Sequence, residues 1–176
     1  MDQPTLALLL GLAGAATNVV WPMLKSRTAM LWAQVVASLF FGTHYLFSGA
    51  QTGAYMNLIA MIQAMLAIPL GERPGFRFAY LATLPVIGTV LWLSWGGIAS
   101  AFAAAGFALI SLGRYQLEPV RFRALMLAAI PAWVAHNIVV SSIPGLIADC
   151  CALVSGAWML RVTLRREPTE TATEPG

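Results

Sequence analysis

Two histidines, the only ones in this chain of 176 residues, carry its clearest chemical signal. His44 and His136 are 92 residues apart, and each is followed nine residues later by a glycine. Each is also followed thirteen residues later by a short polar residue, which is Asn57 or Asp149. Histidine titrates near physiological pH, so a histidine beside a carboxylate can exchange a proton. The repeated spacing predicts an internally duplicated membrane protein with a polar site between its halves.

Asp149 is the most informative of these residues, because it is the only acidic residue inside any apolar segment. Burying a carboxylate in hydrocarbon is costly, so such a residue usually faces a partner or a water-filled cavity. We expect His136 to be that partner, and we expect His44 and Asn57 to form the corresponding pair. At a rise of roughly 1.5 Å per residue, both pairs would lie about 6–8 Å inside the outer boundary.

These residues also have purely structural interpretations, which the sequence leaves open. Histidine and asparagine can be interhelical hydrogen-bond donors that only fasten a bundle. Gly53 and Gly145 are typical of tight turns and close helix approach. Asn18 is a further candidate for a central pathway. Pro131 removes a helical hydrogen bond five residues before His136, which makes it either a gating hinge or a static kink.

The composition places the chain in a membrane. Hydrophobic residues make up 59% of it and charged residues 10%, with a mean hydropathy of +0.76. A soluble domain carries about 25% charged residues. Cys150 and Cys151 are adjacent in an apolar run, and neighbours rarely satisfy disulfide geometry, so we expect two buried thiols. They point to different helix faces, so we expect no metal site with His136 and Asp149.

The elements that position these residues are seven apolar segments of about 20 residues, the length of a membrane span. They are residues 5–21, 28–48, 52–70, 78–95, 97–113, 122–140 and 144–164. All ten lysines and arginines lie around the turns after the first, third and fifth segments or at the end of the seventh. The positive-inside rule makes that face cytoplasmic, with the N-terminus outside and the C-terminus inside. The net charge of +3 then reflects topology and lipid contact, so we expect no nucleic-acid partner.

A shift of 92 residues maps the first three segments onto the last three and leaves the fourth as a linker. Equivalent helices then point the same way, which is a parallel repeat. The sequence therefore predicts an all-α integral membrane protein with seven transmembrane helices in a 3+1+3 parallel repeat. The expected parts are a repeat at 1–70, a linker helix at 71–96, a second repeat at 97–164 and a disordered cytoplasmic tail at 165–176.

One segment resembles a known family. It contains Gln34, then His44 followed by Tyr-Leu-Phe-Ser-Gly-Ala, then Gly53 followed by Ala-Tyr-Met-Asn57. This pattern resembles the second and third helices of the YgjV-type bacterial inner membrane proteins, and the rest of the chain resembles them loosely. The resemblance implies a multi-pass protein of the bacterial inner membrane and brings no established substrate.

A more distant similarity is to the SWEET and PQ-loop transporters and to the PnuC vitamin transporters, which share seven spans and the parallel repeat. In SWEET proteins an asparagine on the third helix and one on the seventh line the substrate pocket. Asn57 and Asp149 occupy those helices here. The aspartate departs from that pattern, and Trp21-Pro22-Met23 stands where a Pro-Gln pair is usual. Sugar specificity therefore does not carry over with the architecture.

These observations predict a transporter or facilitator of a small polar solute, with the alternative of a non-transporting membrane scaffold or accessory subunit. The expected substrate-binding residues are His44, Asn57, His136, Asp149 and Asn18, with Pro131 in gating. We expect no enzyme and no cofactor, because the chain offers no catalytic motif and no nucleophile constellation. The expected partners are the lipid bilayer and the solute, and the sequence leaves a homo-oligomer open.

Overall fold

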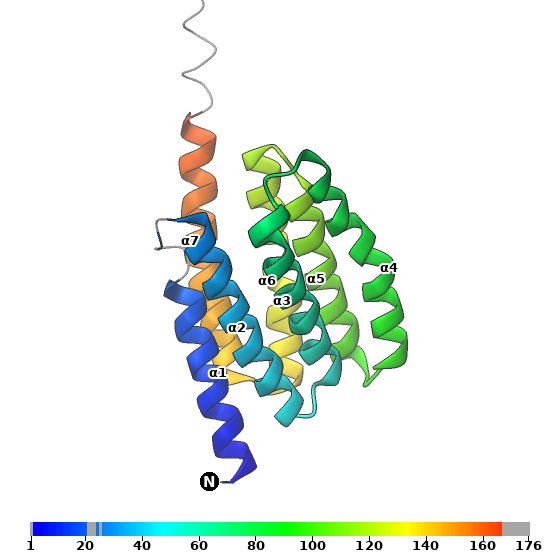
Figure 1. Ribbon diagram of the computed structural model, residues 1–176. Helices are drawn as coiled ribbons and strands as arrows, with labels where there is room; N and C mark the ends of the chain where they lie inside the picture. Colours follow the sequence, from blue (N-terminus) through cyan, green and yellow to red (C-terminus); the bar gives the residue numbers. More distant parts are fainter. Residues whose placement is uncertain (1, 21–23, 25, 167–176) are drawn as a thin grey trace, which may run out of the picture.

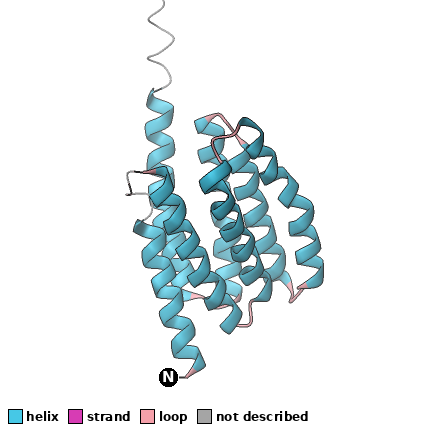
Figure 2. Cartoon of the chain, in the orientation of Figure 1, coloured by secondary structure: helices cyan, strands magenta, loops and turns pink. Residues whose placement is uncertain are grey.

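A computed structural model describes residues 2–20, 24 and 26–166, and within them it contains helices and no strand (Figure 2). Seven helical spans are long and apolar enough to cross a membrane, as the sequence predicts. The helices are α1 Gln3–Val20, α2 Arg27–Phe47, α3 Gln51–Leu70, α4 Phe78–Leu93, α5 Ile98–Tyr115, α6 Pro119–Val139 and α7 Ile143–Arg166. A short 3-10 helix, η2 Pro74–Arg77, leads directly into α4.

The predicted segment boundaries agree with these helices to within a few residues. α6 begins three residues early, with Pro119 in its first turn, where a missing N–H costs nothing. α7 continues through Arg165 and Arg166, so the helix runs past the predicted start of the tail. Residues 167–176 lie outside the described residues, as do Lys25 and the Trp21-Pro22-Met23 segment.

The helices alternate in direction, so their ends form two faces (Figure 1). We call the face with Arg73, Arg77, Arg121 and Arg123 the basic end, and the face with the α2–α3, α4–α5 and α6–α7 turns the non-basic end. Six helices are neighbours in a closed cycle, in the order α1, α2, α3, α5, α6 and α7. α4 packs outside this cycle against α5 and α3, and Ile87 is its one buried residue.

The surface of the bundle is apolar, and its interior contains many small and polar residues beside larger apolar ones. Large side chains such as Leu39, Trp92 and Trp158 are 54%, 82% and 66% exposed. The buried residues of α5 are mostly Gly, Ala and Ser, which let helices approach closely in a membrane. Cys150 and Cys151 are both exposed, so the prediction of buried thiols is wrong. They lie on the outward face of α7, where lipid covers apolar groups as well as protein would.

The α2–α3 and α6–α7 turns have the same backbone geometry. Gly49 and Ser141 both adopt a left-handed conformation, with φ of 75° and 56°. The 6→1 hydrogen bonds of the two turns run from Ala50 N–H to Tyr45 O and from Ser142 N–H to Asn137 O, each at 2.8 Å. This pattern is a Schellman motif, which satisfies carbonyls at a helix C-terminus. The two turns therefore start the following helices, α3 and α7, in the same way.

Candidate functional site

Three polar side chains form a hydrogen-bonded chain that joins α2, α6 and α7 near the non-basic end. The hydroxyl of Tyr45 donates to Oδ1 of Asn137 at 2.7 Å, and Nδ2 of Asn137 donates to Oδ2 of Asp149 at 2.8 Å. Tyr45 is 3% exposed and Asn137 1% exposed, whereas Asp149 is half-buried. Two uncharged groups thus connect an embedded carboxylate on α7 to α2.

His44 ties α2 to α1 and to the turn before α7. Its Nδ1 lies 2.8 Å from the carbonyl oxygen of Ala7, and its Nε2 lies 2.8 Å from Oγ of Ser142. Because a carbonyl oxygen only accepts, Nδ1 carries the hydrogen and the Ser142 hydroxyl donates to Nε2. Oγ of Ser142 in turn accepts from the N–H of Gly145 at 3.1 Å. Both ring nitrogens of His44 therefore have partners.

His136 makes the equivalent bond from Nδ1 to a backbone carbonyl but lacks the equivalent partner for Nε2. Its Nδ1 donates to the carbonyl oxygen of Ala99 at 2.9 Å, and Ala99 stands as far before His136 as Ala7 does before His44. Its Nε2 is buried and has no hydrogen-bond partner within the described part of the chain. The position equivalent to Ser142 in the first half is Ala50, which has no hydroxyl.

The predicted pairing of each histidine with the polar residue thirteen positions later is wrong. The Asn57 amide donates to the carbonyl oxygen of Gly53 on its own helix at 3.0 Å, and Asp149 accepts from Asn137 rather than from His136. The prediction fails because of the way α2 and α6 are rotated about their axes. The ring of His44 points toward α1, and the ring of His136 points toward α5. No group of three or more His, Cys, Asp or Glu side chains is placed to hold a metal ion in the residues the structure covers.

Gly53 and Gly145 provide the space for these contacts. A Cβ atom on Gly53 would lie 2.7 Å from Nε2 of His136, and one on Gly145 would overlap the amide of Asn137. Each glycine thus lies directly beside a buried polar group of α6. The prediction of close helix approach at both glycines is confirmed.

Asn18 and Pro131 occupy other places in the bundle. Asn18 is half-buried, two residues before the end of α1 and therefore near the basic end. Pro131 lies inside α6 and is exposed on its outer surface. Any effect of Pro131 on His136 acts through the backbone of α6.

Aromatic rings surround Tyr45. Its ring stacks on Trp133 with centroids 6.2 Å apart and meets His136 edge-on at 5.2 Å, and Phe41 stacks on it at 5.9 Å. Aromatic pairs at such distances attract one another beyond their burial. We call Tyr45, Trp133, His136 and Asn137 the central layer, because they fill the space between α2 and α6.

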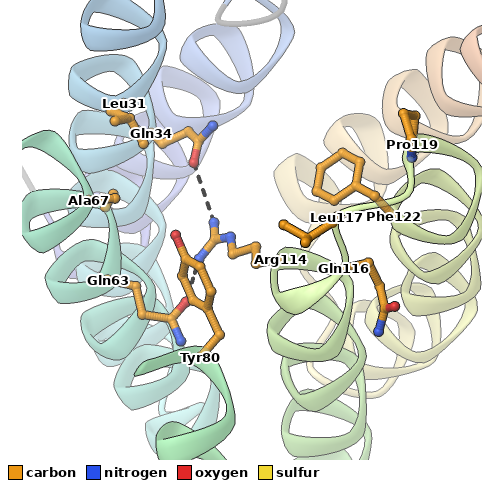
Figure 3. Close-up of a pocket in the computed structure, with 11 residues that line it drawn as sticks. Leu31, Gln34, Gln63, Ala67, Tyr80, Arg114, Gln116, Leu117, Pro119 and Phe122 are labelled. Atoms are coloured by element: carbon orange, nitrogen blue, oxygen red, sulfur yellow. Dashed lines mark hydrogen bonds between the residues drawn. The ribbon is translucent and has the colours of Figure 1, made fainter. Parts of the chain in front are cut away.

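Two pockets of about 450 Å³ each lie at opposite ends of the bundle. The first lies near the basic end between α2–α3 and α5–α6, where Gln34, Gln63, Tyr80 and Arg114 converge (Figure 3). The second lies at the non-basic end among α1, α2 and α7, and His44 lines it. The two pockets share no residue, and no central-layer residue lines either of them.

Sequence reasoning missed Tyr45, Asn137 and Arg114 as site residues. Tyr45 and Asn137 are 92 residues apart, so the spacing of the histidines also marks the next position along the chain. Arg114 was informative only for topology, because the sequence does not reveal that its side chain turns inward to Gln34 and Gln63.

Comparison with known proteins identifies a family. The family model Imp-YgjV, described as a bacterial inner membrane protein, matches residues 5–166. No curated protein matches the chain, and no solved structure matches it.

Proposed function

Because this chain belongs to the Imp-YgjV family of bacterial inner membrane proteins, we propose that it moves a small polar solute across that membrane. Its seven apolar helices make it a multi-pass inner membrane protein. The observation that carries the proposal is the pair of pockets that lie at opposite ends of the bundle. Transporters bind substrate between two structural units and open it to one side at a time. No catalytic step is part of this function.

The two units are α1–α3 and α5–α7, which we take to be copies joined by α4. The equivalent bonds of His44 to Ala7 and of His136 to Ala99 support this duplication. Tyr45 and the residue 92 positions later, Asn137, bond to each other. Residues in equivalent positions meet in this way beside a two-fold axis. An axis along the membrane normal is the arrangement of a parallel repeat.

The basic end faces the cytoplasm in this proposal, with the N-terminus outside. The arginines of the described loops gather at that end, which is the pattern of the positive-inside rule. The pocket with Arg114 is then the inner pocket, and the pocket with His44 is the outer one.

Opening to the outside requires the two units to move apart on the side away from α3 and α5. The α3–α5 seam is held along its length, because Thr52 bonds to Ser100 at 2.8 Å and Gln63 bonds to Ser111 at 3.3 Å. The Tyr45–Asn137 bond joins the units at the outer end and would have to break. Rocking about the α3–α5 seam would expose the Asn137–Asp149 pair to a solute.

Uptake into proteoliposomes over a panel of sugars, amino acids, vitamins and carboxylates tests this function. We expect at least one radiolabelled solute to enter faster than it enters empty liposomes. We expect Asp149→Asn to abolish any stimulation by an inward proton gradient, because the amide cannot take up a proton. Proton-stimulated uptake that persists in Asp149→Asn would remove Asp149 from the coupling, and a panel without uptake would refute the transporter.

A scaffold or accessory subunit is the second candidate. The observation in its favour is that Tyr45, Asn137 and Asp149 already bond to one another inside the bundle, and that both ring nitrogens of His44 have partners. In that case Asp149→Ala lowers the melting temperature in detergent and no solute raises it. A solute that raises the melting temperature of the wild type would exclude the scaffold.

A further inference from the structure

Arg114, at the last turn of α5, projects into the inner pocket. One terminal nitrogen of its guanidinium donates to Oε1 of Gln63 at 2.5 Å, and the other donates to Oε1 of Gln34 at 3.3 Å (Figure 3). Both acceptors are uncharged amides. These two bonds use two of the five N–H donors of the guanidinium, which leaves others for a ligand.

No carboxylate balances this charge in the described structure. Among the side chains that the structure describes, the one salt bridge joins Arg121 to Glu118, and both of these side chains are exposed. Arginine stays protonated in proteins, and a positive charge inside a membrane protein is costly unless an anion pairs with it. Arg114 is half-buried, so its charge is only partly hydrated.

The surroundings hold the arginine in place. Gln63 is 5% exposed, and its Nε2 donates to Oγ1 of Thr83 at 3.0 Å and to Oγ of Ser111 at 3.3 Å. These donations from the amide nitrogen turn the amide oxygen of Gln63 toward Arg114. Four helices therefore contribute to the orientation of one guanidinium, which is the construction of a binding site rather than of a free surface arginine.

Another part of the pocket wall is apolar, and the pocket is large enough for a small molecule. Leu31, Ala67, Leu117 and Phe122 line it together with Arg114 (Figure 3). Its volume of about 450 Å³ is within the range of roughly 300–1,000 Å³ that ligand pockets have. An anionic group at Arg114 would leave the body of the ligand against these apolar side chains.

We propose that the inner pocket binds a small organic anion, whose carboxylate or phosphate group pairs with Arg114 while its body contacts Leu117 and Phe122. The planar guanidinium suits a bidentate bond to such an oxyanion. The proposed binding rests on the geometry of the pocket alone. That the bound anion is also the transported solute rests on the proposed function.

Melting temperature of the full chain in nanodiscs of phosphatidylcholine tests the binding. The probes are benzoate, its uncharged analogue benzamide and inorganic phosphate, each against sodium chloride of equal ionic strength. We expect a saturable rise of about 2–4 °C with benzoate or phosphate and none with benzamide. The proposal would be overturned if neither anion raised the melting temperature, or if benzamide raised it as much as benzoate does.

Three variants locate the effect. Arg114→Gln should lose the response to anions, whereas Arg73→Gln, at the same end on an exposed position, should keep it. Gln34→Glu places a carboxylate beside the guanidinium without a change of size, so it should melt higher than the wild type and no longer respond. An anion response that survives in both Arg114→Gln and Gln34→Glu would contradict the assignment.

A lipid headgroup can present the same phosphate chemistry. Nanodiscs of phosphatidylglycerol distinguish this source, because a bound lipid phosphate would raise the melting temperature in an Arg114-dependent manner and block the response to benzoate. Anion binding without uptake of any solute would leave the binding site standing and refute only the transporter.

Discussion

The amide of Asn137 is the chemical centre of the site, because it pairs on one side with a hydroxyl and on the other with a carboxylate. Its oxygen accepts from Tyr45 and its nitrogen donates to Asp149, so one residue satisfies both neighbours. A polar group left unpaired in a buried position costs about 1–3 kcal/mol. The stability of this region therefore depends on a residue that the histidine pattern alone does not single out.

We predict that Asn137→Leu lowers the free energy of unfolding by about 2–4 kcal/mol, since the buried Tyr45 and the half-buried Asp149 lose their bond at once. Tyr45→Phe should cost about 1 kcal/mol, because Asn137 keeps its bond to Asp149. Asn57→Leu is the matched control, since Asn57 bonds only to a carbonyl of its own helix. Denaturant unfolding in detergent measures all three, and equal losses for Asn137→Leu and Asn57→Leu would contradict the network.

At the residue scale the sequence singled out the two histidines but not the groups that they bond to. The 92-residue spacing marks two histidines whose Nδ1 atoms bond to the carbonyl oxygens of Ala7 and Ala99, in each case 37 residues earlier in the chain. It could not supply their partners, because a rotation of one helix by a single residue position, about 100°, decides which neighbour a side chain meets. The exposed cysteines have the same explanation, since hydropathy does not distinguish a lipid-facing thiol from a buried one.

At the scale of elements, the sequence was nearly sufficient to predict where the helices begin and end. The bilayer requires spans of about 20 apolar residues with every backbone group satisfied, so composition and loop charges alone divide the chain into helices. The sequence could not predict that the two hairpins share a Schellman turn, because a glycine, Gly49, corresponds to a serine, Ser141. A serine at positive φ is the less favourable of the two.

This asymmetry predicts opposite effects of substitution in the two turns. Gly49→Ala should destabilise the protein by about 1 kcal/mol, because a side chain at φ of 75° is strained although the space around it is open. Ser141→Gly should be neutral or stabilising. Gly88→Ala, in the exposed middle of α4, should stabilise by up to about 1 kcal/mol through helix propensity. Thermal unfolding measures the stability of the three variants. A Gly49→Ala protein as stable as the wild type would exclude strain at this turn.

At the scale of the whole molecule, six helices close a cycle around the central layer and α4 stays outside it. The layer lies near the non-basic end, while a second set of inward-facing polar groups, Gln34, Gln63 and Arg114, lies toward the basic end. The proposed function follows from this distribution, because a solute at Arg114 is separated from the other end by side chains that hydrogen-bond across the two units.

Uptake by a variant with a filled inner pocket tests the transport path most directly. Leu31→Trp adds bulk to a residue that lines this pocket, and Leu39→Trp places the same side chain on the lipid-facing side of the same helix, where Leu39 is 54% exposed. For a solute that the wild type transports, we predict that Leu31→Trp slows uptake by about tenfold or more, equivalent to about 1.4 kcal/mol, while Leu39→Trp keeps the wild-type rate. Equal uptake by the folded Leu31→Trp protein and the wild type would contradict a path through the pocket.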